Sequence, residues 1–262
     1  LANWPTLLAD DFLCTNSGAI TNITIWGSWL NDLDNPRTSF LLGLWSDAPA
    51  DPDVPYSRPD KLILQWWFHP GQYLIRQVVG AQERFYDPNL DQILGADTQI
   101  WRYEFPATPT NGFFWQLGRL EKPRIYWISV TAATTNFLFG WKTTPHHFLD
   151  AAVLGHVDAN WTALQDWKPM HRPGSLQPLD LAFGVATDTR VPVIESIRLC
   201  PGNVTIEWTA CPGQVYRLQY RSNVEGPGWT DIPGDIMALG TTATQNDLLL
   251  PERRFYRVVR LP

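Results

Sequence analysis

The chain has 262 residues, of which 44% are hydrophobic and 18% charged, and it carries 14 Trp and 22 Pro but only two Met. This length is sufficient for a sizeable core, and the excess of aromatic and turn-forming residues predicts an all-β protein of many short strands. A formal net charge of -6 with scattered Lys and Arg argues against a nucleic-acid partner, and no apolar run is long enough for a membrane-spanning helix.

The N-terminal segment carries two expectations. The chain begins at Leu1 without a Met, which predicts removal of a signal peptide and a location outside the cell or at its surface. Residues Leu1–Leu8 are expected to form an extended arm, and Asp11–Cys14 a first strand.

The segment Ile20–Leu30 has the clearest period-two pattern in the chain. Because alternate side chains of a strand point to opposite faces, Thr21, Ile23, Ile25 and Trp29 share one face, which is expected to be core. Trp26 shares the other face with Asn, Thr and Ser side chains, and that face is expected to be surface.

Further strands are predicted before residue 188, with a hairpin at His69–Gly71 and a helical turn at His147–Leu154. Their ranges are Phe40–Ser46, Lys61–Phe68, Gln72–Val79, Thr98–Phe105, Phe113–Gln116, Arg124–Thr131, Asn136–Thr143 and Leu179–Val185. Roughly ten strands without alternating helices suit a jelly-roll-like β-sandwich, which we expect over residues 1–188.

Residues 189–262 are predicted to form a second, smaller domain. Its expected strands are Val193–Leu199, Val204–Trp208, Val215–Arg221, Trp229–Ile232, Thr241–Leu250 and Arg254–Leu261. The second, third and last of these resemble the second, third and sixth strands of fibronectin type III or immunoglobulin-like sandwiches. The resemblance implies a seventh strand, which does not follow before Pro262. Either another segment closes the sheet, or the strand from Arg254 is an open edge to which another chain can pair.

Five short motifs span most of the larger domain. They are Ala9–Phe12, Trp26–Trp29, Leu44–Asp47, Phe139–Thr143 and Leu181–Phe183. Together they resemble a family of uncharacterised domains in exported proteins of environmental bacteria, which are often followed by a small sandwich domain. The resemblance implies export, and it supplies no activity and no functional residues.

Tryptophan is the first candidate for function. Twelve of the 14 Trp lie before residue 188, and the neighbours Trp66 and Trp67 must point to opposite faces of a strand. Indole rings are platforms for sugar rings, although most Trp in a wide sandwich fill its core. Trp26 and one of Trp66 and Trp67 are therefore the candidate carbohydrate-binding residues.

Three asparagines are candidates for an attached sugar. Asn22, Asn160 and Asn203 each begin an Asn-x-Thr acceptor pattern for N-glycosylation, which is short enough to arise by chance. Of the three, Asn22 falls with Thr24 on an expected outer face, where an acceptor must lie.

A candidate Ca²⁺ site lies at Asp87, Asn89 and Asp91, which place oxygen side chains at every second position. The full loop pattern is not met, because Gln92 stands where Gly is needed. Capping of an ordinary turn is the alternative for these residues.

The cysteines and histidines give weak signals. Cys200 and Cys211 are close enough in sequence to bridge one loop, whereas Cys14 is expected to be a small buried hydrophobe. The adjacent His146 and His147 do not have the spacing of metal ligands, and no Gly-x-Ser-x-Gly motif occurs.

The sequence thus predicts a non-enzymatic, exported structural protein that associates with copies of itself or with another cell-surface component, by strand addition from the arm Leu1–Leu8. A carbohydrate-binding module that uses exposed Trp is the alternative. A polysaccharide-active enzyme is the third hypothesis, although no pair of Glu lies on one predicted strand of the larger domain.

Overall fold

The computed structural model describes residues 1–33, 38–78, 82–107, 114–118, 120–134, 136–188, 191–223 and 228–261. These residues form antiparallel sheets in sandwich-like arrangements and contain no α-helix, which confirms the all-β prediction. A 3-10 turn at Leu30–Asp32 is the helical segment of this part of the chain, and no helix there is long and apolar enough to cross a membrane.

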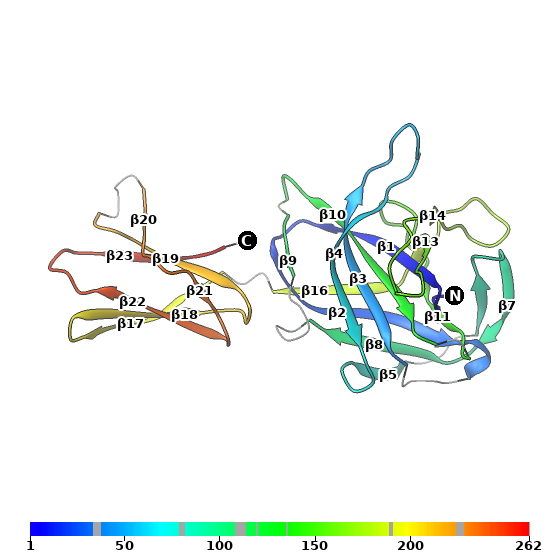
Figure 1. Cartoon of the computed structure of the whole chain (residues 1–262), viewed down its shortest axis with the longest axis horizontal. Helices are drawn as coiled ribbons and strands as arrows, with labels where there is room; N and C mark the ends of the chain where they lie inside the picture. Colours follow the sequence, from blue (N-terminus) through cyan, green and yellow to red (C-terminus); the bar gives the residue numbers. More distant parts are fainter. Residues whose placement is uncertain are drawn as a thin grey trace.

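The N-terminal region contains two large sheets (Figure 1). The first has the order β14 (Lys168–Pro169), β13 (Val153–His156), β1 (Thr6–Cys14), β10 (Arg124–Ala132), β3 (Phe40–Ala48), β4 (Arg58–Phe68). The second has the order β11 (Phe139–Trp141), β2 (Gly18–Trp29), β8 (Ile100–Pro106), β5 (Leu74–Val78). Two further strands, β16 (Phe183–Asp188) and β9 (Trp115–Gln116), also pair with β2.

Two small sheets complete this region. They pair β6 (Glu83–Asp87) with β7 (Gln92–Asp97), and β12 (Thr143–Thr144) with β15 (Asp180–Leu181). The sequence patterns did not predict β6, β7, β12, β13 or β14.

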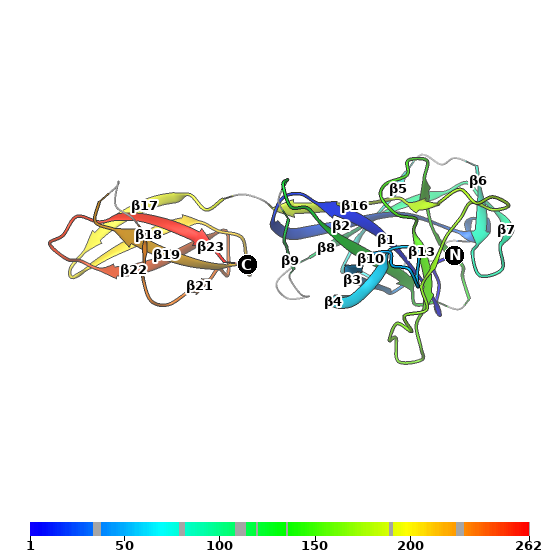
Figure 2. The ribbon, with the colours of Figure 1, turned by 90° about the horizontal axis from the view of Figure 1, so that it is seen from above.

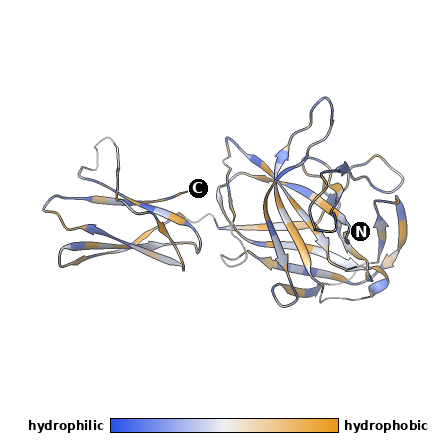
Figure 3. Ribbon diagram, viewed as in Figure 1, coloured by the Kyte–Doolittle hydropathy of each residue, from blue (hydrophilic) through white to orange (hydrophobic). Residues whose placement is uncertain are grey.

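Side chains from both large sheets form one extended core. Strand β2 contributes Ile23, Ile25 and Trp29, each no more than 1% exposed, so the predicted inward face is confirmed for these three residues. It is wrong for Thr21, which is exposed where the pairing of β2 with β16 shifts register. The indole Nε1–H of Trp29 donates to the hydroxyl of Tyr103 at 3.0 Å. Cys14 is also buried in this core, as expected, and hydrophobic residues gather on the central strands (Figure 3).

A second apolar cluster covers the other face of the first sheet. Trp45, Trp127 and Trp167 are buried there against Leu7 and Ala9 of β1. The first sheet is therefore buried on both faces, which accounts for much of the tryptophan content of the chain.

Residues 191–223 and 228–261 form a separate pair of sheets with their own core (Figure 1). One sheet has the order β17 (Ile194–Cys200), β18 (Asn203–Thr209), β22 (Thr242–Leu248). In the other, β19 (Val215–Arg221) pairs with β23 (Phe255–Arg260), β20 (Thr230–Asp231) and β21 (Ile236–Met237), the last of which was not predicted. Trp208 is fully buried in this core, where the fibronectin-like resemblance places it.

Three local predictions are wrong. Leu1–Leu8 is not a free arm, because β1 begins at Thr6, pairs with β10 and β13, and buries Leu7 and Leu8. The turn at His69–Gly71 does not close a hairpin, because β4 pairs with β3 whereas β5 pairs with β8 in the other sheet. His147–Leu154 contains no helical turn, and β13 begins within it.

Three predictions touch residues that are not described. The domain boundary after residue 188 adjoins residues 189–190. The predicted strand at Phe113–Gln116 begins at a residue outside the described ranges, and the predicted strand at Gln72–Val79 ends at one.

Candidate functional site

A cavity of about 960 Å³ lies at one edge of the N-terminal sheets. Two smaller hollows, of about 300 and 60 Å³, are also found in the described residues. Four separate stretches line the large cavity together with Trp26, Glu83 and Ile100: residues 10–13, 142–145, 147–149 and 180–185. Below, it is called the Trp26 cavity.

Trp26 lies on the outward face of β2 and lines this cavity while half-buried. The Arg102 guanidinium carbon lies 5.9 Å from the centre of the indole ring. The expectation that the whole outward face is surface is wrong, because Thr24 is only 7% and Ser28 only 1% exposed. The Ser28 hydroxyl donates to an Asp97 carboxylate oxygen at 2.9 Å, so the β6–β7 hairpin covers that end of the face.

The lysine of the cavity is neutralised by its neighbours. Lys142 Nζ lies 2.6 Å from Glu83 Oε2 and 2.7 Å from Asp97 Oδ1, and the Lys142 side chain is only 11% exposed. Because two carboxylates already hold this ammonium group, the cavity offers no free cation at this position for an anionic ligand.

A histidine–carboxylate pair forms another wall. His147 Nδ1 lies 2.9 and 3.1 Å from the two carboxylate oxygens of Asp180, whose Oδ2 also accepts the backbone N–H of Phe148 at 2.5 Å. The Asp180 side chain is 3% exposed, and that of His147 is 46% exposed. The Nδ1–H group of His147 donates to Asp180, which fixes the orientation of the imidazole at the cavity wall.

Two neighbouring aspartates of β1 adjoin the cavity, and their side chains point to opposite faces of the strand. Burial raises the pKa of Asp10 from 3.8 to about 8, although its carboxylate accepts backbone N–H groups from Leu181 at 2.6 Å and Asp11 at 2.9 Å. Burial, followed by the carboxylate of Asp150, likewise raises the pKa of Asp11 to about 8. The two oxygens of Asp11 are buried without a hydrogen bond of normal geometry. Burial therefore disfavours the charged form of both groups.

Together these groups suit a neutral ligand with many hydroxyl groups. The half-exposed imidazole of His147, which Asp180 holds in place, supplies a polar group at the cavity wall. Trp26 and Phe148, which is 65% exposed, supply apolar ring surface. A mostly apolar cavity with a few convergent polar groups is typical of a small-molecule or sugar site.

One known family matches the part of the chain that contains this cavity. Residues 2–186 match the family model described as a domain of unknown function, DUF7901. The chain belongs to the DUF7901 family. All the residues that line the Trp26 cavity lie within the matched range. No curated protein and no solved structure matches the chain.

The other two predicted sugar-binding residues lie outside the Trp26 cavity of the DUF7901 region. Trp66 is 1% exposed in the core, so it has no face for a sugar, and its candidacy is wrong. Trp67 points to the opposite face, as the strand pattern predicts, and is half-buried. Its ring stacks on His69 at 6.0 Å between centres and meets Trp161 edge-on at 4.8 Å.

The three glycosylation candidates lie in different settings. Asn22 is half-buried between β8 and β16, and its Nδ2 donates to Thr24 Oγ1 at 3.0 Å. Asn160 is exposed in a turn whose backbone is capped by Asp158, and Asn203 is half-buried at the start of β18. An attached sugar stays a prediction at all three.

The Asp87–Asp91 turn is a capped turn and not a converging ligand set. Asp87 Oδ1 accepts the backbone N–H of Asn89 at 2.9 Å, and Asp91 Oδ1 accepts the hydroxyl of Tyr86 at 2.9 Å. The Asn89 side chain turns to Thr6 and His156 instead. Within the described ranges, no group of three or more His, Cys, Asp or Glu could hold a metal ion, so the Ca²⁺ prediction finds no support.

The predicted disulfide between Cys200 and Cys211 is wrong, and all three thiols are free. Cys200 pairs with Asn203 at one end of the β17–β18 ladder, whereas Cys211 follows Thr209 at the other end of β18. A seven-residue strand spans about 20 Å, far beyond the reach of a disulfide.

Sequence reasoning missed Asp10, Lys142, His147 and Asp180 as site residues. They come from segments far apart in the chain, and none has a local motif. The one available signal was that Asp10, Lys142 and Leu181 fall within three of the motifs that resemble exported bacterial domains. Those motifs gave no indication that the segments meet around one cavity.

Proposed function

We propose that the DUF7901 region binds a glycan in the Trp26 cavity. The observation that carries this proposal is the half-buried indole of Trp26 beside buried carboxyl groups in a cavity of about 960 Å³. An indole face packs on the apolar face of a sugar ring, while His147, which Asp180 holds in place, exchanges hydrogen bonds with its hydroxyl groups.

Electrostatics favours a neutral glycan over an anionic one. The cavity is lined by four carboxyl groups, and its lysine is held by Glu83 and Asp97. A uronic acid or sulfated sugar would therefore find no unpaired ammonium or guanidinium group in the lining of this cavity. An exported location, where polysaccharides are available, fits this function and is part of the proposal.

The test is a binding screen on a glycan array and on insoluble polysaccharides, followed by Trp26→Ala. Loss of an indole contact of about 1.5 kcal/mol or more weakens binding about tenfold or more. Trp67→Ala is the matched control, because Trp67 is a half-buried outward Trp that does not line the Trp26 cavity. Retention on no glycan, or equal losses in the two variants, would rule out the Trp26 cavity as the binding site.

Self-association is the second candidate function. The buried position of Leu7 and Leu8 excludes the route in which the N-terminal arm is donated to a neighbour. A different feature, the open side of the C-terminal sheets, favours association and is developed below.

A further inference from the structure

Two apolar side chains on the inner face of the C-terminal sheets are uncovered. In the β17–β18 ladder, Ile197 lies opposite Ile206 and Leu199 opposite Val204. Directly opposed residues share a face of the sheet, and Ile206 and Val204 are 0% and 6% exposed in the core. Ile197 and Leu199 therefore point to the same inner side, yet they are 53% and 74% exposed.

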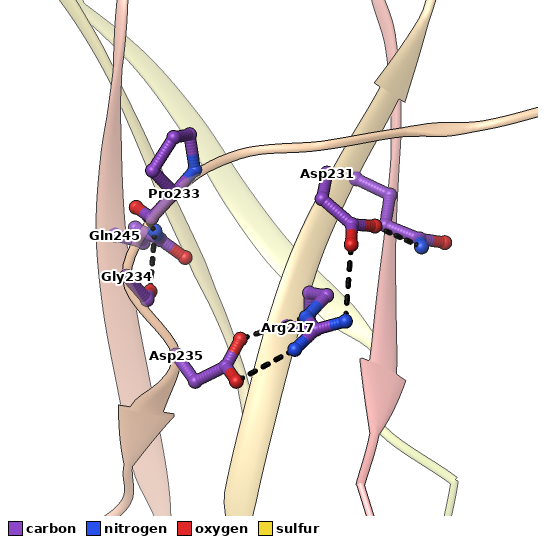
Figure 4. A network of polar contacts seen from close by, with 7 residues as sticks. Arg217, Asp231, Pro233, Gly234, Asp235 and Gln245 are labelled. Carbon is purple, nitrogen blue, oxygen red and sulfur yellow. Dashed lines mark hydrogen bonds and ion pairs between the residues drawn. The ribbon is translucent and has the colours of Figure 1, made fainter.

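The facing sheet stops short above these side chains. Strand β23 pairs with β19, and among the described residues no second strand pairs with β23. The opposite side of the sandwich is closed, because Gln245 of β22 donates its Nε2 to the backbone oxygens of Pro233 and Gly234 at 3.0 and 2.8 Å (Figure 4). Strands β17 and β23 lie along one side of the pair of sheets, and β21 and β22 along the other (Figure 2).

The outer face of the β19 sheet is occupied by its own polar and cation–π contacts. Arg217 binds Asp231 at 3.0 Å and Asp235 at 2.8 Å (Figure 4). The Trp229 ring is contacted by Arg221 and Arg257, whose guanidinium carbons lie 4.3 and 4.4 Å from its centre. These contacts occupy part of the outer face, whereas Ile197 and Leu199 lie uncovered on the open side.

We propose that two copies of the chain associate through this open side. Strand β23 of each copy pairs antiparallel with β23 of the other, so that the two β19 sheets become continuous. Ile197 and Leu199 of both copies then pack together beneath the new sheet. A two-fold axis brings the same edge of both copies together, as in most homodimers.

A second copy fits this side better than a single donated strand does. Both sheets are open here, because β17 pairs with β18 alone within the described residues and β23 with β19 alone. One added strand would close the β23 edge and leave the β17 edge open. A second copy faces both edges at once, and unpaired strand edges are templates for such pairing. This proposal is independent of glycan binding in the Trp26 cavity.

The test is multi-angle light scattering of the chain over a wide range of concentration, with Leu199→Glu. Leu199 is already mostly exposed, so a charge there is compatible with the folded single chain. Leu239→Glu is the matched control, since Leu239 is 91% exposed and follows β21 on the closed side.

The proposal expects a dimer for the unchanged chain and for Leu239→Glu, and a monomer for Leu199→Glu. Hydrogen exchange should show the β23 amides that point away from β19 protected in the dimer and unprotected in Leu199→Glu. A monomer at every concentration, a dimer that Leu199→Glu leaves intact, or growth beyond a dimer would each overturn it.

Discussion

Replacing Asp11 with asparagine removes a carboxyl group that holds its proton more tightly in the folded chain than in the unfolded one. Burial raises the pKa of Asp11 from 3.8 to about 8. Between about pH 5 and pH 7 the folded chain keeps this proton and the unfolded chain has lost it. The free energy of unfolding therefore falls as the pH rises, by up to about 1.4 kcal/mol per pH unit for this group.

Asparagine is uncharged at every pH, so Asp11→Asn should make the pH slope of stability shallower by about this amount. The amide buried without a partner lowers stability by about 1–3 kcal/mol at all pH values, which leaves the slope unaffected. Asp10, whose pKa burial also raises to about 8, keeps its own contribution to the slope.

Urea unfolding across this pH range measures the slope directly. Asp53→Asn is the matched control, because Asp53 is exposed in a loop and its replacement should leave the slope unchanged. Equal slopes in the unchanged chain and in Asp11→Asn would refute the assignment of a buried, protonated carboxyl at this position.

Three further outcomes are expected. Tyr103→Phe leaves the buried Nε1–H of Trp29 without its acceptor and should lower stability by about 1–3 kcal/mol, measured by urea unfolding. Gly27→Ala should lower stability by about 1–3 kcal/mol or more, because the added Cβ would overlap the ring of Phe139, and an unchanged melting temperature would contradict this packing. Thiol labelling of the native chain should modify Cys200 rapidly and the other two cysteines only after unfolding. If Cys200 and Cys211 formed a disulfide, only one thiol would react in the unfolded chain.

Where a strand has one buried face, the period-two pattern was sufficient to predict which of its side chains are buried. The alternation in β2 correctly places Ile23, Ile25 and Trp29 inside, and the opposite directions of Trp66 and Trp67 follow from the same rule. The burial of Ser28 on the outward face of β2 was not predictable, because the β6–β7 hairpin that covers it comes from a distant part of the chain.

Closeness in sequence led to two wrong predictions, a hairpin and a disulfide, because the path of the chain between the two segments was not known. Pro70 and Gly71 suggested a hairpin, but the chain crosses from one sheet to the other at that turn. Cys200 and Cys211 are close in sequence, yet an extended strand separates them. Proximity along the chain limits distance only when the intervening residues fold back, and here they do not.

The Trp26 cavity is likewise a product of tertiary structure. Asp10, Trp26, His147 and Asp180 belong to four segments that β-sheet pairing brings together, and only Trp26 stood out in the sequence. The period-two pattern identified Trp26 because its neighbours on that face are polar, and it carried no information about the partners from other strands.

Hydrogen–deuterium exchange with a saturating oligosaccharide from the glycan screen tests the Trp26 cavity most directly. Glycan binding there predicts added protection in the segments 10–13, 142–149 and 180–185, and loss of that protection in Trp26→Ala. Protection around Trp67 and Trp161 instead, or protection that Trp26→Ala leaves unchanged, would contradict glycan binding in this cavity.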